Sequence, residues 1–221
     1  MRKWIIVLAV VVLAGGGFYI WFSGSTSEPS TPLTAPTVSQ AGASAQTYAI
    51  DSSSSKATFM IDEVLRGSPA TVVGSTDQVA GEVSLDPSDT STAQIGTIKI
   101  NARTFVTDES QRNNAIRRFI LQTDQYEFIE FVPTKIEGMP ASIDVGSRFS
   151  FTVAGDLTVK DSTNTVTFDV SATLVSDTQI EGTATAKITR SEFGVTIPSV
   201  PFVADVSNDV ALQLDFVATI G

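Results

Sequence analysis

Few side chains in this sequence have the types and spacing that chemistry requires. The 221-residue chain contains no His and no Cys, so it lacks the commonest general base, the commonest metal ligand and any thiolate nucleophile. A segment near the C-terminus carries Asp205, Asn208 and Asp209, whose side-chain oxygens are of the kind that bind cations. A single loop of this composition is more typical of a turn with Asx capping, so we predict no metal site.

The remaining charged residues also form no recognisable catalytic arrangement. Glu127 and Glu130 lack the spacing of an acid/base pair, and neither a Gly-rich phosphate loop nor a nucleophile elbow is present. Arg112, Arg117 and Arg118 could bind an anionic headgroup, but we favour a solvated face with carboxylate partners. A formal net charge of −10 argues against nucleic-acid binding. We therefore predict a protein that is not an enzyme.

The clearest pattern in the sequence is instead an alternation of apolar and polar residues along most of the chain after residue 48. This period of two is typical of antiparallel strands with one face in water. Turn sequences such as 86–89 and 161–164 indicate hairpins between neighbours. The sheet must then close into a barrel or stack on a second sheet. About eight strands are predicted, near residues 57–61, 79–85, 98–102, 129–131, 149–159, 166–174, 180–188 and 210–218.

The first half of segment 105–131 breaks this alternation with helical periodicity. Asp108 and Gln111 have the spacing of a capping box, which predicts one short helix of about three turns. The helix should cover one mouth or side of the sheet and exclude water from it. Ile116, Phe119 and Ile120 share one face of this helix, and we expect Phe105, Phe119 and Phe131 to point into the apolar interior.

The N-terminal residues predict a membrane anchor. Arg2 and Lys3 precede an uncharged run, 4–22, which as a helix reaches about 28 Å. Trp4 and Trp21 stand at its two ends, as in an aromatic belt. A single-pass transmembrane helix with a cytoplasmic N-terminus would place the rest of the chain outside the cytoplasm. The alternative is a cleaved signal peptide and a secreted protein.

Composition divides the chain into three parts. Residues 1–22 are the anchor or signal segment, and residues 23–46 form a Ser/Thr/Pro linker that we predict to be disordered. Residues 47–221 form the β domain.

Residue spacing alone does not decide whether the interior is filled by side chains or contains a cavity. An eight-stranded barrel is just wide enough to be filled by side chains or to hold one small ligand. Gly155, Gly182, Ala184 and Ala186 are small inward-facing residues that leave volume, but opposing phenylalanines could fill it. A cavity and a filled core are both compatible with this pattern.

Four segments in order resemble the bacterial YceI-like family of polyisoprenoid-binding, lipocalin-like proteins. They are Tyr48-Ala49-Ile50-Asp51 followed by Ala57-Thr58-Phe59; Thr107-Asp108 to Arg112 with Ile116-Arg117, Leu121, Tyr126 and Phe131; Gly155-Asp156-Leu157-Thr158-Val159 with Val166-Thr167-Phe168; and Arg190-Ser191-Glu192-Phe193-Gly194. The resemblance covers nearly all of 48–221. It implies an antiparallel lipocalin-like barrel in the periplasm or outside the cell, without catalytic residues.

The same resemblance implies a lumen that takes an isoprenoid, a quinone or another long-chain lipid, and no further cofactor or metal. Ser54-Ser55 stands where family members often carry His-Ser, and Arg112-Asn113 where they often carry Arg-Asp. These departures concern contacts with a polar headgroup and leave the apolar lumen unaffected. Arg190 matches a motif position, and we expect it to form a buried or rim ion pair rather than a ligand contact.

We therefore predict a membrane-tethered lipid-binding protein of the bacterial envelope, whose partners are a long-chain apolar lipid and the membrane. The alternative is a non-catalytic structural or interaction module of the envelope with a filled barrel core. The predicted lumen residues are Phe59, Ile61, Ile98, Ile100, Phe105, Phe119, Phe131, Phe149, Phe151, Val153, Leu157, Phe168, Val170, Ala184, Ala186, Phe193, Leu214 and Phe216.

Overall fold

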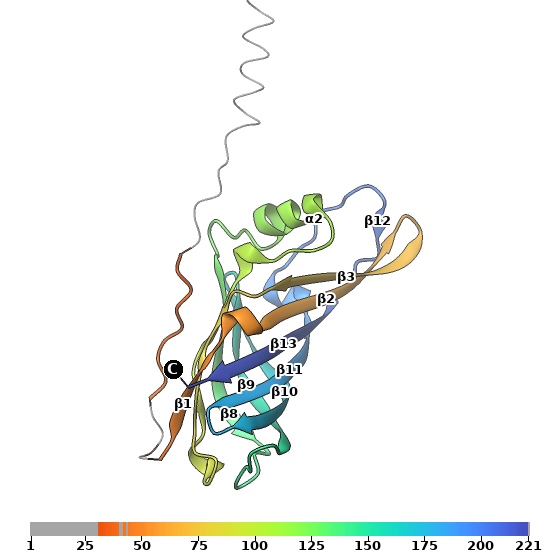
Figure 1. Cartoon of the computed structure of the whole chain (residues 1–221). Coiled ribbons are helices and arrows are strands. Elements are labelled where there is room, and N and C mark those ends of the chain that lie inside the picture. Colours follow the sequence, from red (N-terminus) through yellow and green to blue (C-terminus); the bar gives the residue numbers. More distant parts are fainter. Residues whose placement is uncertain (1–30, 40–41, 43, 221) are drawn as a thin grey trace, which may run out of the picture. The chain divides into compact units, whose positions relative to one another are not determined.

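The computed structural model describes residues 31–39, 42 and 44–220 (Figure 1). The predicted anchor, 1–22, and residues 23–30 of the predicted linker lie outside this part of the chain. Within it, no helix is both long and apolar enough to cross a bilayer.

Antiparallel strands make up most of the described chain, as the alternating pattern predicts. Thirteen strand segments form one curled, barrel-like sheet in this part of the chain. They are β1 (Gln46–Ile50), β2 (Lys56–Leu65), β3 (Ser68–Thr76), β4 (Val79–Ala80), β5 (Glu82–Leu85), β6 (Gln94–Ile95), β7 (Ile98–Asn101), β8 (Phe128–Glu137), β9 (Arg148–Val159), β10 (Ser162–Ser176), β11 (Gln179–Thr189), β12 (Val203–Ala204) and β13 (Asp209–Thr219).

Strand pairing wraps the sheet around an interior. From β13, the pairings run through β1 to β5, across the one-residue break at Gly81 to β4, and then through β7, β8, β9, β10 and β11 back to β13. The first half of β13 also pairs with β2, which carries β3 and β12 away from this path. This curl brings the apolar faces of distant strands together.

Five strand segments go beyond the predicted eight: two come from breaks in bent strands, and β1, β3 and β12 were not predicted. Breaks at Gly81 and at 96–97 divide single bent strands into β4–β5 and β6–β7. The β2–β3 hairpin was missed because 68–76 does not alternate regularly. Its two-residue turn has positive φ at both Arg66 (52°) and Gly67 (81°), which is the type I′ geometry that tight hairpins favour.

The predicted short helix is present, with a different cap and a different second half. The α-helix α2 (Ser110–Ala115) is followed by the π-helical turn η4 (Ile116–Ile120), and short 3-10 turns occur at Ser52–Ser54, Thr90–Thr92, Ala102–Thr104 and Arg190–Phe193. Asp108 was predicted as the cap, but Glu109 accepts the hydrogen bond from Gln111 N at 3.2 Å. Asp108 instead accepts a hydrogen bond from Arg112, one helical turn on.

Residues 31–39 lie within the predicted linker and contact the β domain. Thr31 donates from its backbone N and Oγ1 to the two carboxylate oxygens of Glu127, at 2.8 and 2.6 Å. Val38 N donates to Glu82 Oε2 at 2.9 Å. These contacts attach the described part of the linker to the sheet, while the predicted domain boundaries remain a prediction.

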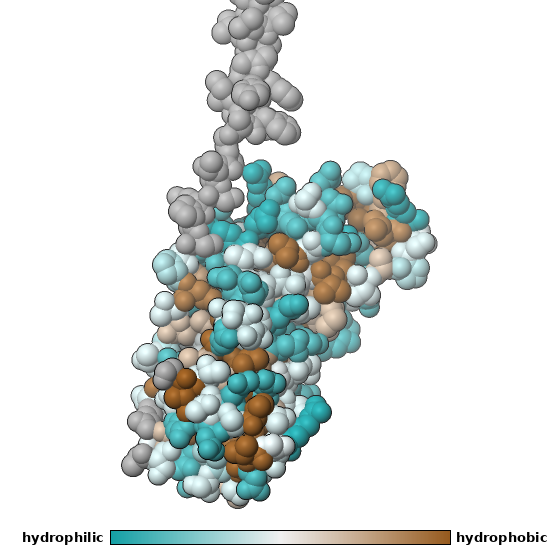
Figure 2. Space-filling view, in the orientation of Figure 1, coloured by the Kyte–Doolittle hydropathy of each residue, from teal (hydrophilic) through white to brown (hydrophobic). Residues whose placement is uncertain are grey.

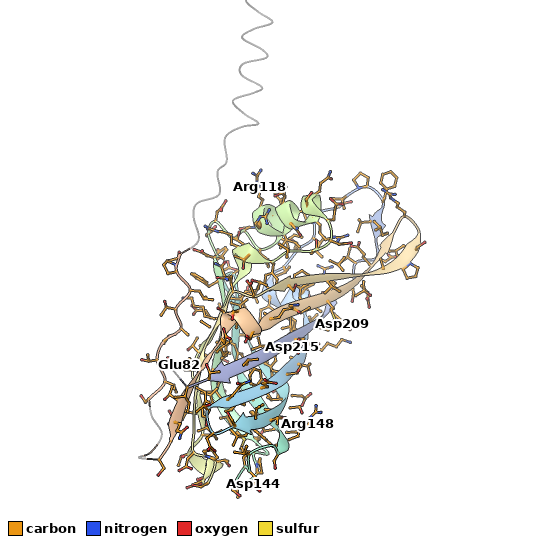
Figure 3. The ribbon with its side chains drawn as sticks, in the orientation of Figure 1. Glu82, Arg118, Asp144, Arg148, Asp209 and Asp215 are labelled. Atoms are coloured by element: carbon orange, nitrogen blue, oxygen red, sulfur yellow. The ribbon has the colours of Figure 1, made fainter. Side chains whose placement is uncertain are left out.

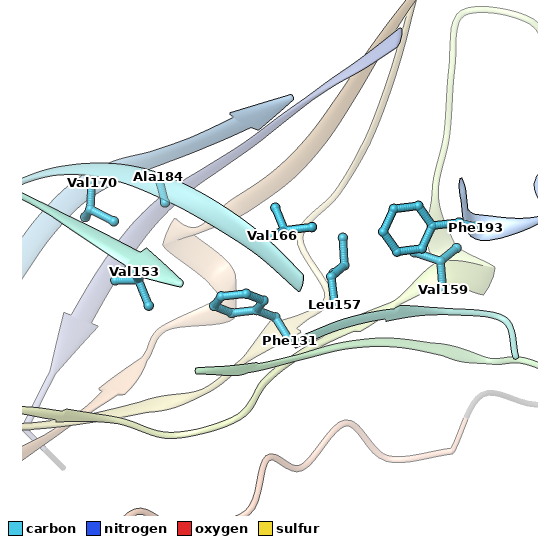
Figure 4. Packing of buried hydrophobic residues seen from close by; sticks show 8 residues of the cluster. All are labelled: Phe131, Val153, Leu157, Val159, Val166, Val170, Ala184 and Phe193. Carbon is cyan, nitrogen blue, oxygen red and sulfur yellow. The ribbon is translucent and has the colours of Figure 1, made fainter. Parts of the chain in front are cut away.

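Buried side chains form three hydrophobic clusters within the sheet. The largest combines residues of β8, β9, β10 and β11 with Phe193, which lies beside Val159 (Figure 4). A second cluster surrounds Tyr48 and Leu174 at the end of the sheet where β1 begins. A smaller third cluster, Ile61, Val72 and Val210, lies where β2, β3 and β13 meet. The interior is therefore lined by apolar residues from nearly every strand.

Tyr48 gives this core a measurable pH dependence. Its side chain is fully buried, and its hydroxyl donates to the carbonyl of Asp177 at 3.0 Å. Burial, and secondarily the charge of Asp177, raise the pKa of the Tyr48 phenol above its ordinary value. The folded state thus holds the phenolic proton more tightly than the unfolded state. Its contribution to stability is complete below the unfolded pKa of about 10 and is lost as pH rises from there through the folded pKa.

Tyr48→Phe should therefore flatten the alkaline loss of stability. At neutral pH the variant should be less stable by about 1 kcal/mol, because the carbonyl of Asp177 loses a hydrogen bond. Urea unfolding of both proteins at neutral pH and above pH ~10 checks this expectation. A parallel loss of stability in the two proteins at high pH would contradict it.

Candidate functional site

A large cavity occupies the interior of the curled sheet. Its volume is about 870 Å³, and its lining is overwhelmingly apolar. This volume lies in the upper part of the range of about 300–1,000 Å³ that small-molecule pockets span. Of the two interiors compatible with the sequence pattern, the structure has the one with a cavity.

The predicted lumen residues come together around this cavity. All eighteen except Ala186 line it. Ala186 packs against the largest hydrophobic cluster instead, on the same face of β11 as Ala184. Their role as ligand contacts stays a prediction.

Aromatic rings shape the wall. Phe131 and Phe168 meet edge to face with their ring centroids 4.9 Å apart, and Phe59 meets Phe105 in the same way at 5.3 Å. Edge-to-face pairs are the preferred geometry of packed aromatic rings. These rings, from β2, β8, β10 and the segment after β7, form part of the cavity wall.

The small inward residues fall into two groups with different roles. A Cβ at Gly155 would lie 2.7 Å from Phe131 Cζ, and one at Gly182 would lie 2.7 Å from Phe216 Cζ. The sequence left open whether phenylalanine rings would fill the space at these two glycines, and in the structure they do. Ala184 does line the cavity, and it is 9% exposed. The open volume therefore lies over Ala184 rather than over the glycines.

Exposed apolar side chains surround one end of the cavity. The cavity lining includes η4 and the loop 195–206, whose Phe119 and Phe202 are 63% and 74% exposed. Phe105 and Phe131 are buried as predicted, but Phe119 lies largely in solvent rather than in the interior. Brown apolar groups are visible toward the end that carries β12 and the β2–β3 hairpin (Figure 2). We call this end, formed by α2, η4 and loop 195–206, the mouth.

Polar groups line the cavity near α2. Glu63 on β2 is 8% exposed, and its Oε1 lies 3.6 Å from Arg112 Nη2. Arg112 therefore has two carboxylate neighbours, Asp108 and Glu63, and reaches the cavity rather than only solvent. Arg117 donates to Asn114, and Arg118 is exposed at the end of the domain opposite Asp144 (Figure 3). Only Arg112 of the three arginines contributes to the cavity wall.

Arg190 and the segment that carries Asn208 and Asp209 form hydrogen bonds and ion pairs within the protein. Arg190 was expected to form an ion pair, but it donates to the backbone carbonyls of Ser207 and Val195 at 2.9 and 3.1 Å. Asn208 Oδ1 accepts a hydrogen bond from Ser191 N, in the 3-10 turn that begins at Arg190, at 3.2 Å. Asp209 forms an ion pair with Lys187 at 2.7 Å. These contacts fix the loop that closes one side of the mouth.

Sequence reasoning missed two parts of the cavity wall, and each has a signal in the chain. Glu63 continues the inward row Ala57, Phe59 and Ile61 at a spacing of two, so it is a charged residue on an apolar face. The loop 195–206 is rich in Val, Ile, Phe and Pro although it forms almost no strand. Apolar side chains without a sheet to cover are typical of a segment that folds over a cavity.

The fold and the cavity together define a barrel-like β protein with a large internal apolar cavity. The YceI-like domain family matches residues 48–218, and the chain belongs to this family. The predicted family membership is thereby confirmed. No curated protein sequence matches the chain.

Solved structures share this fold at low sequence identity. Burkholderia cenocepacia BcnA is 21% identical with a TM-score of 0.61, over 77% of this chain and 99% of its own. A polyisoprenoid binding domain from Saccharophagus degradans is 13% identical with a TM-score of 0.63, over 79% and 98%. Campylobacter jejuni YceI is 16% identical with a TM-score of 0.52, over 67% and 84%. These similarities establish the fold.

Proposed function

We propose that this protein is a non-catalytic carrier that holds an isoprenoid or another long-chain apolar lipid inside its curled, lipocalin-like barrel. The observation that carries the proposal is the apolar cavity of about 870 Å³. The alternative is a structural or interaction module with a filled barrel core. It does not explain such a space, because protein interiors ordinarily contain few voids larger than a water molecule.

Comparison with known structures supports the same ligand class. The chain belongs to the YceI-like family, and the similar domain from Saccharophagus degradans is described as polyisoprenoid binding. The cavity lining of this chain has the chemistry that such a ligand needs, since branched aliphatic and aromatic side chains solvate a hydrocarbon chain without hydrogen bonds.

The energetics favour a long ligand. Each buried methylene contributes about 0.8 kcal/mol, so about ten of them contribute about 8 kcal/mol. Association of a small molecule costs an estimated ~4–15 kcal/mol in lost translational and rotational freedom. Short chains therefore barely offset that cost, whereas longer chains that fill the cavity exceed it.

The proposed location is outside the cytoplasm and close to a membrane. It rests on Arg2, Lys3 and the uncharged run 4–22, which lie outside the described residues. Fractionation of cells that express the full chain or a chain without residues 1–22 tests it. Recovery of the full chain in the soluble cytoplasmic fraction would contradict both anchoring and secretion.

Extraction of the purified protein tests the proposed function directly. Organic extraction followed by mass spectrometry should recover a lipid with a long hydrocarbon chain in amounts comparable to the protein. The Ala184→Phe variant, purified in parallel, should release much less. Repeated extraction of the native protein without any lipid would overturn the proposal.

A further inference from the structure

Glu63 is the one carboxyl group on an otherwise apolar row of cavity-lining residues. The inward positions of β2 are Ala57, Phe59, Ile61, Glu63 and Leu65, and all five line the cavity. Glu63 is 8% exposed, which places its carboxylate among hydrocarbon rather than in bulk water. A buried charged group normally has its hydrogen bonds satisfied within the protein, so the partners of Glu63 are informative.

The hydrogen-bonding capacity of Glu63 is incomplete among the described residues. Its Oε1 is buried and accepts no hydrogen bond there. Arg112 Nη2 is the nearest cationic atom, but at 3.6 Å it is beyond a good N–H···O distance. The guanidinium of Arg112 is oriented by a hydrogen bond from its Nη1 to Asp108. The open capacity beside the cavity is therefore that of an acceptor.

The cationic groups of the cavity are already engaged. Arg112 faces the carboxylates of Asp108 and Glu63, and Arg190 donates to the backbone carbonyls of Ser207 and Val195. A phosphate or carboxylate on a ligand would have to compete for these donors. It would also approach the Glu63 carboxylate, and like charges at close range repel strongly in a low-dielectric site.

A ligand chain that fills this end of the cavity lies against the Glu63 carboxylate, which is part of the lining. A purely apolar end would leave the buried carboxylate without a hydrogen bond, which carries a desolvation penalty. A hydroxyl group would instead donate a hydrogen bond to the Glu63 carboxylate. Polar sites of this kind discriminate strongly against analogues that lack the required group.

From this geometry, and on the basis of the proposed function, we propose that Glu63 selects ligands whose polar end donates a hydrogen bond, such as an isoprenoid alcohol or a quinol. The hydroxyl donates to the Glu63 carboxylate at the α2 side of the mouth, and the hydrocarbon chain fills the apolar cavity beyond it. Isoprenoid phosphates and chains without a donor bind less tightly.

Three ligands with the same hydrocarbon chain test this proposal: geranylgeraniol, its methyl ether and geranylgeranyl phosphate. Displacement of a fluorescent lipid probe from the full chain gives the three dissociation constants. The alcohol should bind about tenfold or more tightly than the ether, which is typical for a hydrogen bond to a charged group. It should also bind more tightly than the phosphate.

Two substitutions of Glu63 and one matched control complete the test. Glu63→Leu should remove the preference for the alcohol over the ether while leaving ether binding intact, and Glu63→Gln should reduce the preference without changing the shape of the side chain. Asp62→Asn changes the neighbouring exposed carboxylate, which accepts from Thr71 on the outside of β2, and should keep the full preference. Thermal unfolding checks that each variant folds.

The outcomes separate this proposal from the proposed function. Equal binding of alcohol and ether to the native protein would overturn the role of Glu63 and leave lipid binding in the cavity standing. Tightest binding of the phosphate would also overturn it and would indicate that the arginines select the headgroup. Failure of all three ligands to bind would overturn the proposed function and this proposal together.

Discussion

Ala184→Phe should weaken lipid binding strongly while leaving the protein folded. Ala184 lines the cavity from β11, opposite Val170 of β10 and Leu214 of β13. A phenyl ring at this position has the cavity to occupy, and it then excludes part of the ligand. Displacing about four methylenes loses about 3 kcal/mol of hydrophobic contact. That loss corresponds to roughly a hundredfold weaker binding.

Titration of the native and variant proteins with a fluorescent fatty-acid or isoprenoid probe measures the effect. Thr185→Phe is the matched control, because Thr185 is the next residue on β11 and its side chain is exposed on the outer face. This control should bind the probe like the native protein. If the interior were packed solid, Ala184→Phe would instead lower stability by about 1–3 kcal/mol and there would be no binding to lose.

Gly155→Ala should destabilise the fold strongly. A Cβ at Gly155 would lie 2.5 Å from the carbonyl oxygen of Val132 and 2.7 Å from Phe131 Cζ. The ring of Phe131 could turn into the cavity, but the carbonyl belongs to the paired backbone of β8 and cannot move away without breaking the sheet. Overpacking of this kind typically costs about 1–3 kcal/mol, and we expect the upper end of that range.

Urea unfolding measures this loss, and Gly96→Ala is the control. A Cβ at Gly96 comes no closer than 3.3 Å to its nearest neighbour, Glu82 O, so small adjustments accommodate it. The control should lie within about 1 kcal/mol of the native protein, because alanine also reduces the entropy of the unfolded chain. If Gly155→Ala matched the control, the close packing of Phe131 over this glycine would not matter for stability.

Local pattern accounts for much of what could be predicted here. Alternation along β9, β10, β11 and β13 specified antiparallel strands and their inward faces, because a residue's side in a strand depends only on parity. That is why nearly all of the predicted lumen residues surround the cavity. Helical periodicity likewise located α2 and η4, although Glu109 rather than Asp108 caps the helix, since both acidic residues precede the first turn.

The alternation of side chains along a strand does not specify how far a side chain reaches or which residues lie opposite it. Gly155 and Gly182 appear as gaps in the sequence, yet Phe131 and Phe216 cover them, because the curl of the sheet brings these rings over the neighbouring strand. Only the packed structure distinguishes a gap that is filled from one that stays open, as over Ala184.

The polar end of the cavity depends still more on tertiary structure. Glu63 and Arg112 are separated by almost fifty residues, and only the placement of α2 beside β2 brings them to 3.6 Å. Residue types and periods specify the strands, their apolar faces and the absence of His and Cys chemistry. The open volume, the mouth and the carboxylate that faces it arise from distances between segments that are remote in the chain, which no local pattern encodes.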